Sequence, residues 1–203
     1  MNLPPLARLA VGVAGVAAAT AFALVARRSH RELPVVGHLP AFELIDERGA
    51  PFSSAAMLGH VSVVDFIFTR CPSSCPRLTA QMGQLQERFA HDAPNVRLVS
   101  FSVDPENDTP AVLAEYAVKA GARPSRWIFV TGPVDEVARA VVLGFKVSAA
   151  KVATGAGDYD VTHGEWLVLV DRAGYLRGYY PTAEPKELDA LADDVLRLDR
   201  DVH

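Results

Sequence analysis

One apolar segment, residues 61–68 (VSVVDFIF), narrows the possible folds of this 203-residue chain. Six of its eight residues are Val, Ile or Phe, and valines separate its two polar residues, Ser62 and Asp65. Nearly continuous runs of β-branched and aromatic residues are typical of strands that are buried on both faces. Such strands need a layer of helices above and below them, so the segment predicts an α/β fold.

The remaining residues alternate between helical and extended patterns. Residues 76–91 repeat apolar residues at the spacing of one helical face, at Leu78, Met82, Leu85 and Phe89. Thr109 and Pro110 suit the N-cap and first position of a second helix, which ends before Gly121. We expect further strands at 41–46, 96–103, 127–130, 166–170 and 175–180, helices at 134–143 and 184–198, and an extra hairpin within the irregular residues 145–162. This order predicts a mixed sheet in one domain, residues 41–203.

The first 31 residues have a different composition. Residues 10–26 (AVGVAGVAAATAFALVA) carry no charge, and arginines flank them on both sides. Their length is at the short end of what spans the hydrocarbon core of a membrane. Two interpretations stay open, an uncleaved membrane anchor and a signal peptide cleaved near Ala21-Phe22-Ala23, which resembles a small-x-small cleavage site. We expect residues 1–31 to be this anchor or signal segment and residues 32–40 to be a linker.

Charge is unevenly divided along the chain. Residues 1–31 contain four arginines and no acidic residue, which leaves residues 32–203 with 16 basic and 24 acidic side chains, a net charge of −8. An acidic domain is a poor electrostatic match for nucleic acid, so we expect no nucleic-acid partner. The arginines after the apolar segment, taken alone, favour a domain on the cytoplasmic side.

The chain has two cysteines, Cys71 and Cys75, which lie within five residues of each other, soon after the apolar segment 61–68. Two cysteines exclude a multi-disulfide scaffold and a four-cysteine zinc site. They lie between a buried strand and a helix, at the edge where open α/β sheets bind ligands. The positive end of the helix dipole, together with Arg70, is expected to favour their thiolate forms. The pair therefore predicts a metal or redox site, with two small buried core residues as the alternative.

One of the six histidines, His163, is expected to lie at the same edge of the sheet, in a loop before the strand at 166–170. Two thiolates and one imidazole form a soft ligand set that suits copper(I) and tolerates copper(II). A loop histidine with a local hydrogen bond is the alternative for His163. Asp104 follows a buried strand at this edge and is a candidate neighbour of the ligands. For Glu106 and Asp108 we expect helix capping and a solvated turn.

Three segments of the chain resemble a known family. FIFTRCPSSCPRLTAQM, SVDPENDTPAVLAEYA and YDVTHGEWLVLVDRAGYLRGYY, in this order, are similar to the signature blocks of the Sco (SenC) family. These are thioredoxin-like copper proteins involved in assembling cytochrome c oxidase. The resemblance extends from about Leu39 to the C-terminal helix. It implies a thioredoxin-like fold with an N-terminal extension and an inserted β-hairpin, preceded by one N-terminal transmembrane or signal-anchor helix.

The resemblance also implies a site and a location. The copper ligands would be Cys71, Cys75 and His163, and the acidic position of the family's second block falls on Asp104. We expect Arg70, which stands where the family frequently has another residue, to lie with Asp104 around these ligands. The domain would be held on the periplasmic side of the inner membrane, and this outweighs the arginine count.

The function implied is that of a membrane-tethered copper metallochaperone. It would assist assembly of the dinuclear copper centre of cytochrome c oxidase, with the copper-binding subunit of the oxidase and other copper chaperones or thiol reductants as partners. The alternative is a thiol–disulfide oxidoreductase that reduces the copper-binding cysteines of that subunit through the same two thiols. A sensor of copper or redox state would leave the same sequence pattern. A peroxidase is disfavoured because its resolving cysteine is usually distant.

Overall fold

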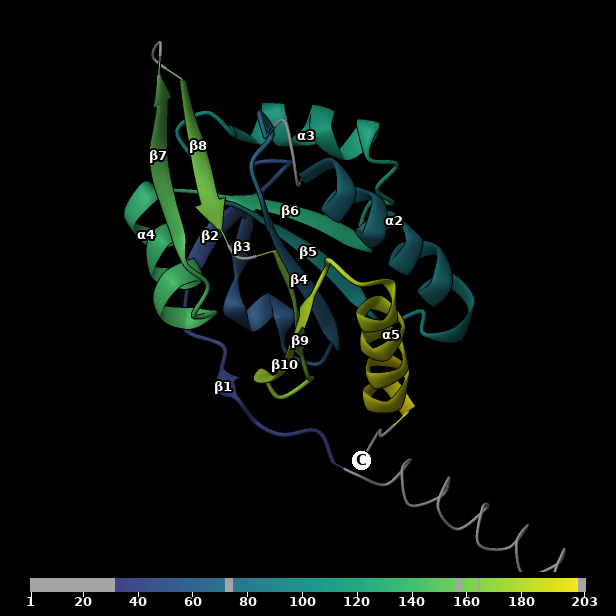
Figure 1. Cartoon of the computed structure of the whole chain (residues 1–203). Helices are drawn as coiled ribbons and strands as arrows, with labels where there is room; N and C mark the ends of the chain where they lie inside the picture. The colour runs from purple at the N-terminus through teal and green to yellow at the C-terminus, as the bar shows by residue number, and fades with distance from the viewer. Residues whose placement is uncertain (1–31, 72–74, 156–157, 164, 201–203) are drawn as a thin grey trace, which may run out of the picture. The chain divides into compact units, whose positions relative to one another are not determined.

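A mixed β-sheet forms the centre of the unit that spans residues 34–203. The computed structural model describes residues 32–71, 75–155, 158–163 and 165–200. The strands of this sheet are β1 (Gly37–His38), β2 (Glu43–Asp46), β3 (Pro51–Ser53), β4 (Ser62–Ile67), β5 (Arg97–Ser102), β6 (Trp127–Thr131), β9 (Trp166–Val170) and β10 (Tyr175–Pro181). Their spatial order is β1-β10-β9-β4-β5-β6-β2-β3 (Figure 1). The predicted α/β class and mixed sheet are confirmed.

Strand β4 occupies the middle of this sheet, and all six of its residues are buried. It pairs in parallel with β5, where Phe66 lies opposite Phe101, and antiparallel with β9, where Val64 lies opposite Val168. Pairing on both sides leaves this strand without an exposed edge. Its side chains are buried on both faces as well, which explains the apolar run.

Helices cover both faces of the sheet. They are α2 (Cys75–Asp92), α3 (Pro110–Lys119), α4 (Val134–Ala138) and α5 (Pro185–Arg200). The four apolar residues predicted to form one face of α2 are all buried. Helix α5 lies beside α2 in Figure 1, and Arg88 of α2 bridges Asp189 and Asp193 of α5. The N-cap of α3 is Thr109, whose hydroxyl accepts the N–H of Val112, as the sequence predicts.

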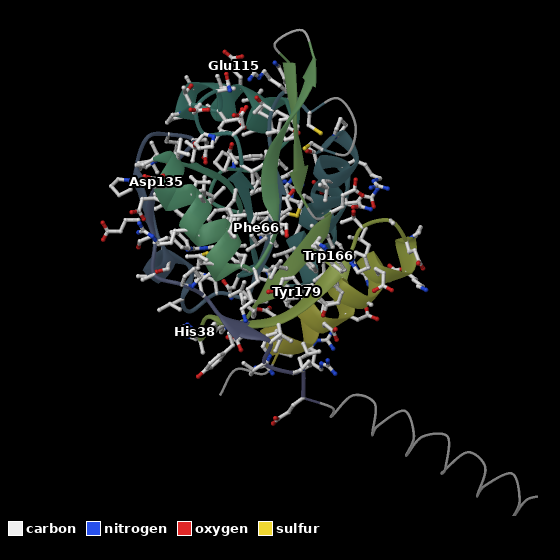
Figure 2. The ribbon with its side chains drawn as sticks, turned by 60° about the vertical axis from the view of Figure 1, so that its left-hand side comes forward. His38, Phe66, Glu115, Asp135, Trp166 and Tyr179 are labelled. Carbon is white, nitrogen blue, oxygen red and sulfur yellow. The ribbon has the colours of Figure 1, made fainter. Side chains whose placement is uncertain are left out.

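The two faces of β4 have different surroundings because its side chains alternate in direction. Val64 and Phe66 belong to a buried cluster that also contains Phe101 and Phe145. Figure 2 shows Phe66 inside the molecule, and its ring lies 5.4 Å from that of Phe145, centroid to centroid. Asp65 points to the other face, which α2 covers. The acidic residue is therefore on the side of the sheet that carries the cysteine helix.

A second, two-stranded sheet is formed by β7 (Ala149–Gly155) and β8 (Asp158–His163). Their antiparallel register places Ala149 opposite His163. Figure 1 shows this hairpin projecting beyond the main sheet. An inserted hairpin is confirmed, but His163 is the last residue of a strand and not part of a loop as expected.

Two further details differ from the sequence prediction. The expected linker, residues 32–40, contains β1, because Gly37 and His38 pair with the otherwise open edge of β10. The helix expected at 134–143 is divided into α4, which ends at Ala138, and a π-helical turn, Arg139–Gly144. A short 3₁₀ helix, Ser54–Met57, lies earlier in the chain. The predicted membrane segment, residues 10–26, lies outside the described residues. Within the part that is described, no helix has the length and apolar character needed to cross a bilayer.

Candidate metal centre

The two cysteines lie where β4 gives way to α2. After Ile67 the chain makes a turn in which the N–H of Cys71 donates to the carbonyl of Phe68 at 3.2 Å. Cys75 is the first residue of α2, and its backbone N–H is directed at the Cys71 Sγ atom at 3.4 Å. Both side chains are thiols without a disulfide, and they are 8% and 1% exposed. The predicted strand-to-helix placement of the pair is confirmed.

The protonation of Cys75 differs from what the sequence predicts. Burial raises the pKa of its thiol, and the nearby Cys71 and Asp65 raise it further, while a backbone hydrogen bond at Phe68 acts in the opposite direction. The helix start and Arg70 were expected to favour a thiolate. That expectation is wrong for Cys75, because removing the sulfur from water disfavours its charged form more than the helix end favours it. A metal ion must therefore displace a proton to bind this sulfur.

Asp65 is a polar residue of this region that the sequence interpretation left unused. Its carboxylate Oδ1 accepts the Ser100 hydroxyl at 2.5 Å, and Ser100 Oγ in turn accepts the indole N–H of Trp127 at 2.8 Å. Oδ2 has no hydrogen-bond partner among the described residues. Burial raises the pKa of Asp65 to about 7, although the bond from Ser100 lowers it. The signal in the sequence is that Asp65 is the one acidic residue of a largely apolar strand.

Asp104 lies beside the cysteine loop, as expected. Its carboxylate is buried, and its Oδ1 and Oδ2 atoms accept hydrogen bonds from Asn107 Nδ2 at 3.1 and 3.0 Å. The guanidinium of Arg70 lies 3.5 Å from Oδ2. Arg70 itself is mostly exposed and precedes Cys71 directly. The ion pair thus connects the loop after β5 to the loop that carries the first cysteine.

Asp108 was expected in a solvated turn, and this is wrong, while Glu106 is exposed as expected. The backbone N–H of Asp108 donates to the carbonyl of Asp104 at 2.9 Å, which turns the loop back over the end of β4. The Asp108 carboxylate is consequently buried and accepts hydrogen bonds from Thr69 and Ser102. Burial raises the pKa of Asp108, while the bonds from Ser102 and Thr69 lower it.

The backbone around His163 approaches the start of α2. Glu165, two residues after His163, forms an ion pair with Arg77, two residues after Cys75. Gln81 of α2 donates to the carbonyl of Thr182, whose own N–H donates to the carbonyl of Glu165. Figure 2 shows Trp166, the first residue of β9, next to Tyr179 of β10. These contacts bring the segment that contains His163 to the cysteine end of α2.

The donor set on the described side chains is incomplete by itself. Cys71 and Cys75 supply two sulfur donors, and the described residues contain no group of three or more histidines, cysteines or acids able to hold a metal ion. The side chain of His163 lies outside this description. Two adjacent thiols at a sheet edge suit either a soft metal ion, completed by one more ligand, or thiol–disulfide exchange.

An α/β fold with a cysteine pair between its central strand and the following helix defines a thioredoxin-like thiol or metal protein. The comparisons specify which: residues 34–198 match the SCO1/SenC family model. The SCO1 protein homolog of Bacillus subtilis is 32% identical over 163 residues, which cover 80% of this chain and 83% of that protein. The chain therefore belongs to the SCO1/SenC family.

Solved structures agree with this assignment. ScoI of Bradyrhizobium japonicum with copper bound is similar with a TM-score of 0.68 and 27% identity, covering 78% of this chain and 99% of that one. BsSco, described as a member of the Sco family of cytochrome c oxidase assembly proteins with a disulfide switch, has a TM-score of 0.71 and 30% identity, covering 85% of this chain and all of that one. The expected thioredoxin-like fold of this family is thus confirmed.

Proposed function

We propose that this protein is a copper metallochaperone that assists assembly of the dinuclear copper centre of cytochrome c oxidase. The buried, reduced cysteine pair, with the N–H of Cys75 directed at the sulfur of Cys71, is the observation that carries the proposal. Thiolate sulfur is a soft donor that selects copper(I). The copper-bound ScoI structure supports the same cargo here, because it shares the fold and 27% of its residues with this chain.

His163 completes the proposed site. The ion pair between Arg77 and Glu165 joins the segment after Cys75 to the segment after His163, because each partner lies two residues beyond one of these proposed ligands. Two sulfurs and one imidazole leave copper with few ligands, which suits transfer to another protein. Arg70 and Asp104 support the loop around the ligands through their ion pair.

Transfer begins on the side of Cys71. Its side chain is 8% exposed, whereas that of Cys75 is 1% exposed. A ligand of the copper-binding oxidase subunit therefore meets copper where Cys71 holds it, and Cys75 is released last. Loading from other copper chaperones also begins at Cys71, the more exposed sulfur, and each sulfur loses its proton when it binds the metal.

The test is an oxygen-free titration of the full chain with copper(I) against a competing chelator, in mild detergent. We expect one copper ion per chain, with binding lost in Cys71→Ser and Cys75→Ser and weakened in His163→Ala. The matched control is His91→Ala, which removes an exposed histidine at the end of α2. Full copper binding by Cys71→Ser would refute the proposal.

We also propose that residues 10–26 tether the protein to the inner membrane with its domain in the periplasm. The uncharged composition of this segment and the family's place in oxidase assembly support this location. An alkaline phosphatase fusion to the C-terminus tests it. Activity of the fusion is expected, and its retention in membranes after alkaline extraction distinguishes an anchor from a cleaved signal peptide. An inactive fusion that is present in normal amounts would contradict the periplasmic location.

A second function, reduction of a disulfide in the oxidase subunit, is favoured by the thiol state of the pair and by the disulfide switch described for BsSco. Cys71, the more exposed thiol, attacks one sulfur of the partner disulfide as a thiolate. Cys75 then resolves the mixed disulfide, so that the partner gains two electrons and two protons and this protein acquires a Cys71–Cys75 disulfide. His163→Ala separates the functions, because it impairs copper transfer and leaves thiol exchange intact.

A further inference from the structure

A carboxylate from a different part of the chain holds the turn that presents Cys71. Asp108 lies in the loop between β5 and α3, and its Oδ1 accepts the hydroxyl of Thr69 at 2.6 Å. Its Oδ2 accepts the backbone N–H of Thr69 at 3.1 Å and the hydroxyl of Ser102 at 2.6 Å. These donors belong to Ser102, the last residue of β5, and to Thr69, two residues after the end of β4.

The contact with Thr69 replaces a bond of the sheet. The ladder between β4 and β5 ends where the N–H of Val103 donates to the carbonyl of Ile67 at 2.8 Å. The next N–H on this edge of β4 belongs to Thr69, and it meets the Asp108 carboxylate instead of a backbone carbonyl. The chain can therefore leave the strand direction at Phe68 and turn toward Cys71 without losing a buried hydrogen bond.

Thr69 is inside the turn that places the first cysteine. This turn is closed by the bond from the N–H of Cys71 to the carbonyl of Phe68. Asp108 is itself held in place, because its N–H bonds to the carbonyl of Asp104 and because Ser102 also accepts the N–H of Asp104 at 3.1 Å. The position of the Asp108 carboxylate is thus set by hydrogen bonds within its own loop, and the turn that contains Thr69 is positioned by its hydrogen bonds to this carboxylate.

We propose that Asp108 is a positioning residue for the cysteine pair: through Thr69 it fixes the turn that sets the sulfur of Cys71 against the N–H of Cys75. The copper part of this inference rests on the proposed function, whereas the effect on the thiols does not. Removing a supporting contact around metal ligands typically costs about 10- to 100-fold in affinity. We expect a loss of at least about 10-fold in copper affinity here, because both the backbone N–H and the hydroxyl of Thr69 bond to the carboxylate.

Two variants of Thr69 test the proposal without disturbing the buried acid. Thr69→Val has nearly the same shape and lacks the hydroxyl donor, while Thr69→Ser keeps it. Asp108→Asn is studied in parallel, and Asp46→Asn is the matched control. Asp46 is also a buried carboxylate that orders a turn, through Arg48 and Ala50, but it lies on β2, three positions from β4 in the sheet.

Three measurements are made on the full chain: copper(I) affinity, the sulfur-to-copper charge-transfer spectrum of the copper(II) form, and the rate at which the reduced, metal-free thiols react with a small aromatic disulfide. Thr69→Val and Asp108→Asn are expected to lower the affinity by about 10-fold or more, shift the spectrum and change the thiol rate. Thr69→Ser is expected to restore all three toward the original values. Asp46→Asn is expected to lower the unfolding temperature and to leave the three readouts unchanged.

The outcomes separate this inference from the proposed function. Original values in Thr69→Val, or an equal response in Asp46→Asn, overturn the positioning role. If the unaltered chain binds no copper, the proposed function fails, and the thiol rate alone decides whether Asp108 positions the pair. If Asp108→Asn does not fold, the comparison of Thr69→Val with Thr69→Ser gives the decision.

Discussion

Replacing Asp65 by Asn is expected to change how the stability of the protein depends on pH. The carboxyl group is fully buried in the middle of β4, with one hydrogen bond from Ser100 to one of its oxygens. Burial raises its pKa from 3.8 to about 7. The folded protein therefore keeps a proton on Asp65 over a range of pH in which the unfolded chain has lost it.

The sign and size of the effect follow from this difference. Between pH 3.8 and about 7 the folded state binds one proton more than the unfolded state, so the free energy of unfolding falls as the pH rises. About three pKa units at about 1.4 kcal/mol each give a loss on the order of 4 kcal/mol by pH 8. Asn can still accept the Ser100 hydroxyl and does not titrate. Asp65→Asn should therefore gain stability relative to the original protein as the pH rises.

Urea unfolding of the reduced, metal-free chain at several pH values from 4.5 to 8 measures this difference. The two proteins differ only at residue 65, so the difference in their unfolding free energies isolates the contribution of Asp65. An unchanged m-value shows that both unfold to similarly exposed states. If the difference stays constant between pH 4.5 and 8, Asp65 does not titrate near 7 and the argument from its burial is wrong.

Three further predictions concern stability and are checked by the same unfolding measurements. Burial would raise the pKa of Asp46, but hydrogen bonds from Arg48 and Ala50 prevail and lower it, so Asp46→Asn should destabilise the protein at pH 7 and lose this effect as the pH falls below 3.8. A difference that grows on acidification would contradict this. Thr109→Ala should cost about 1 kcal/mol by removing the N-cap of α3, and Thr109→Ser should cost less. Phe89→Ala should cost about 3–5 kcal/mol, because the ring at the end of the apolar face of α2 is fully buried; a loss below about 1 kcal/mol would show that this end of the helix is not packed.

The sequence predicts the parts of this fold that depend on local pattern. The apolar run that became β4 and the four apolar residues of α2 need only strand and helix periodicity to be recognised. The N-cap at Thr109 is likewise a local signal. Strand β1 was missed because the pairing of Gly37 with Leu176 depends on the open edge of a strand far along the chain.

The candidate site shows the same division. The position of Cys71 and Cys75 between strand and helix follows from their neighbours in sequence. The high pKa of Cys75 does not, because it depends on how deeply packing buries the sulfur. Asp108 was missed for a similar reason: its partner Thr69 is 39 residues away, and only the folded chain brings its carboxylate to that backbone N–H.

X-ray absorption of the copper-loaded full chain tests the central claim most directly, because it counts the atoms bound to the metal. We expect two sulfur neighbours and one imidazole nitrogen per copper(I) ion. The nitrogen should disappear in His163→Ala, and Cys71→Ser, which is expected to lose copper binding, should show no copper–sulfur shell. A shell of nitrogen and oxygen without sulfur, or a spectrum that Cys71→Ser leaves unchanged, would contradict copper binding by the cysteine pair.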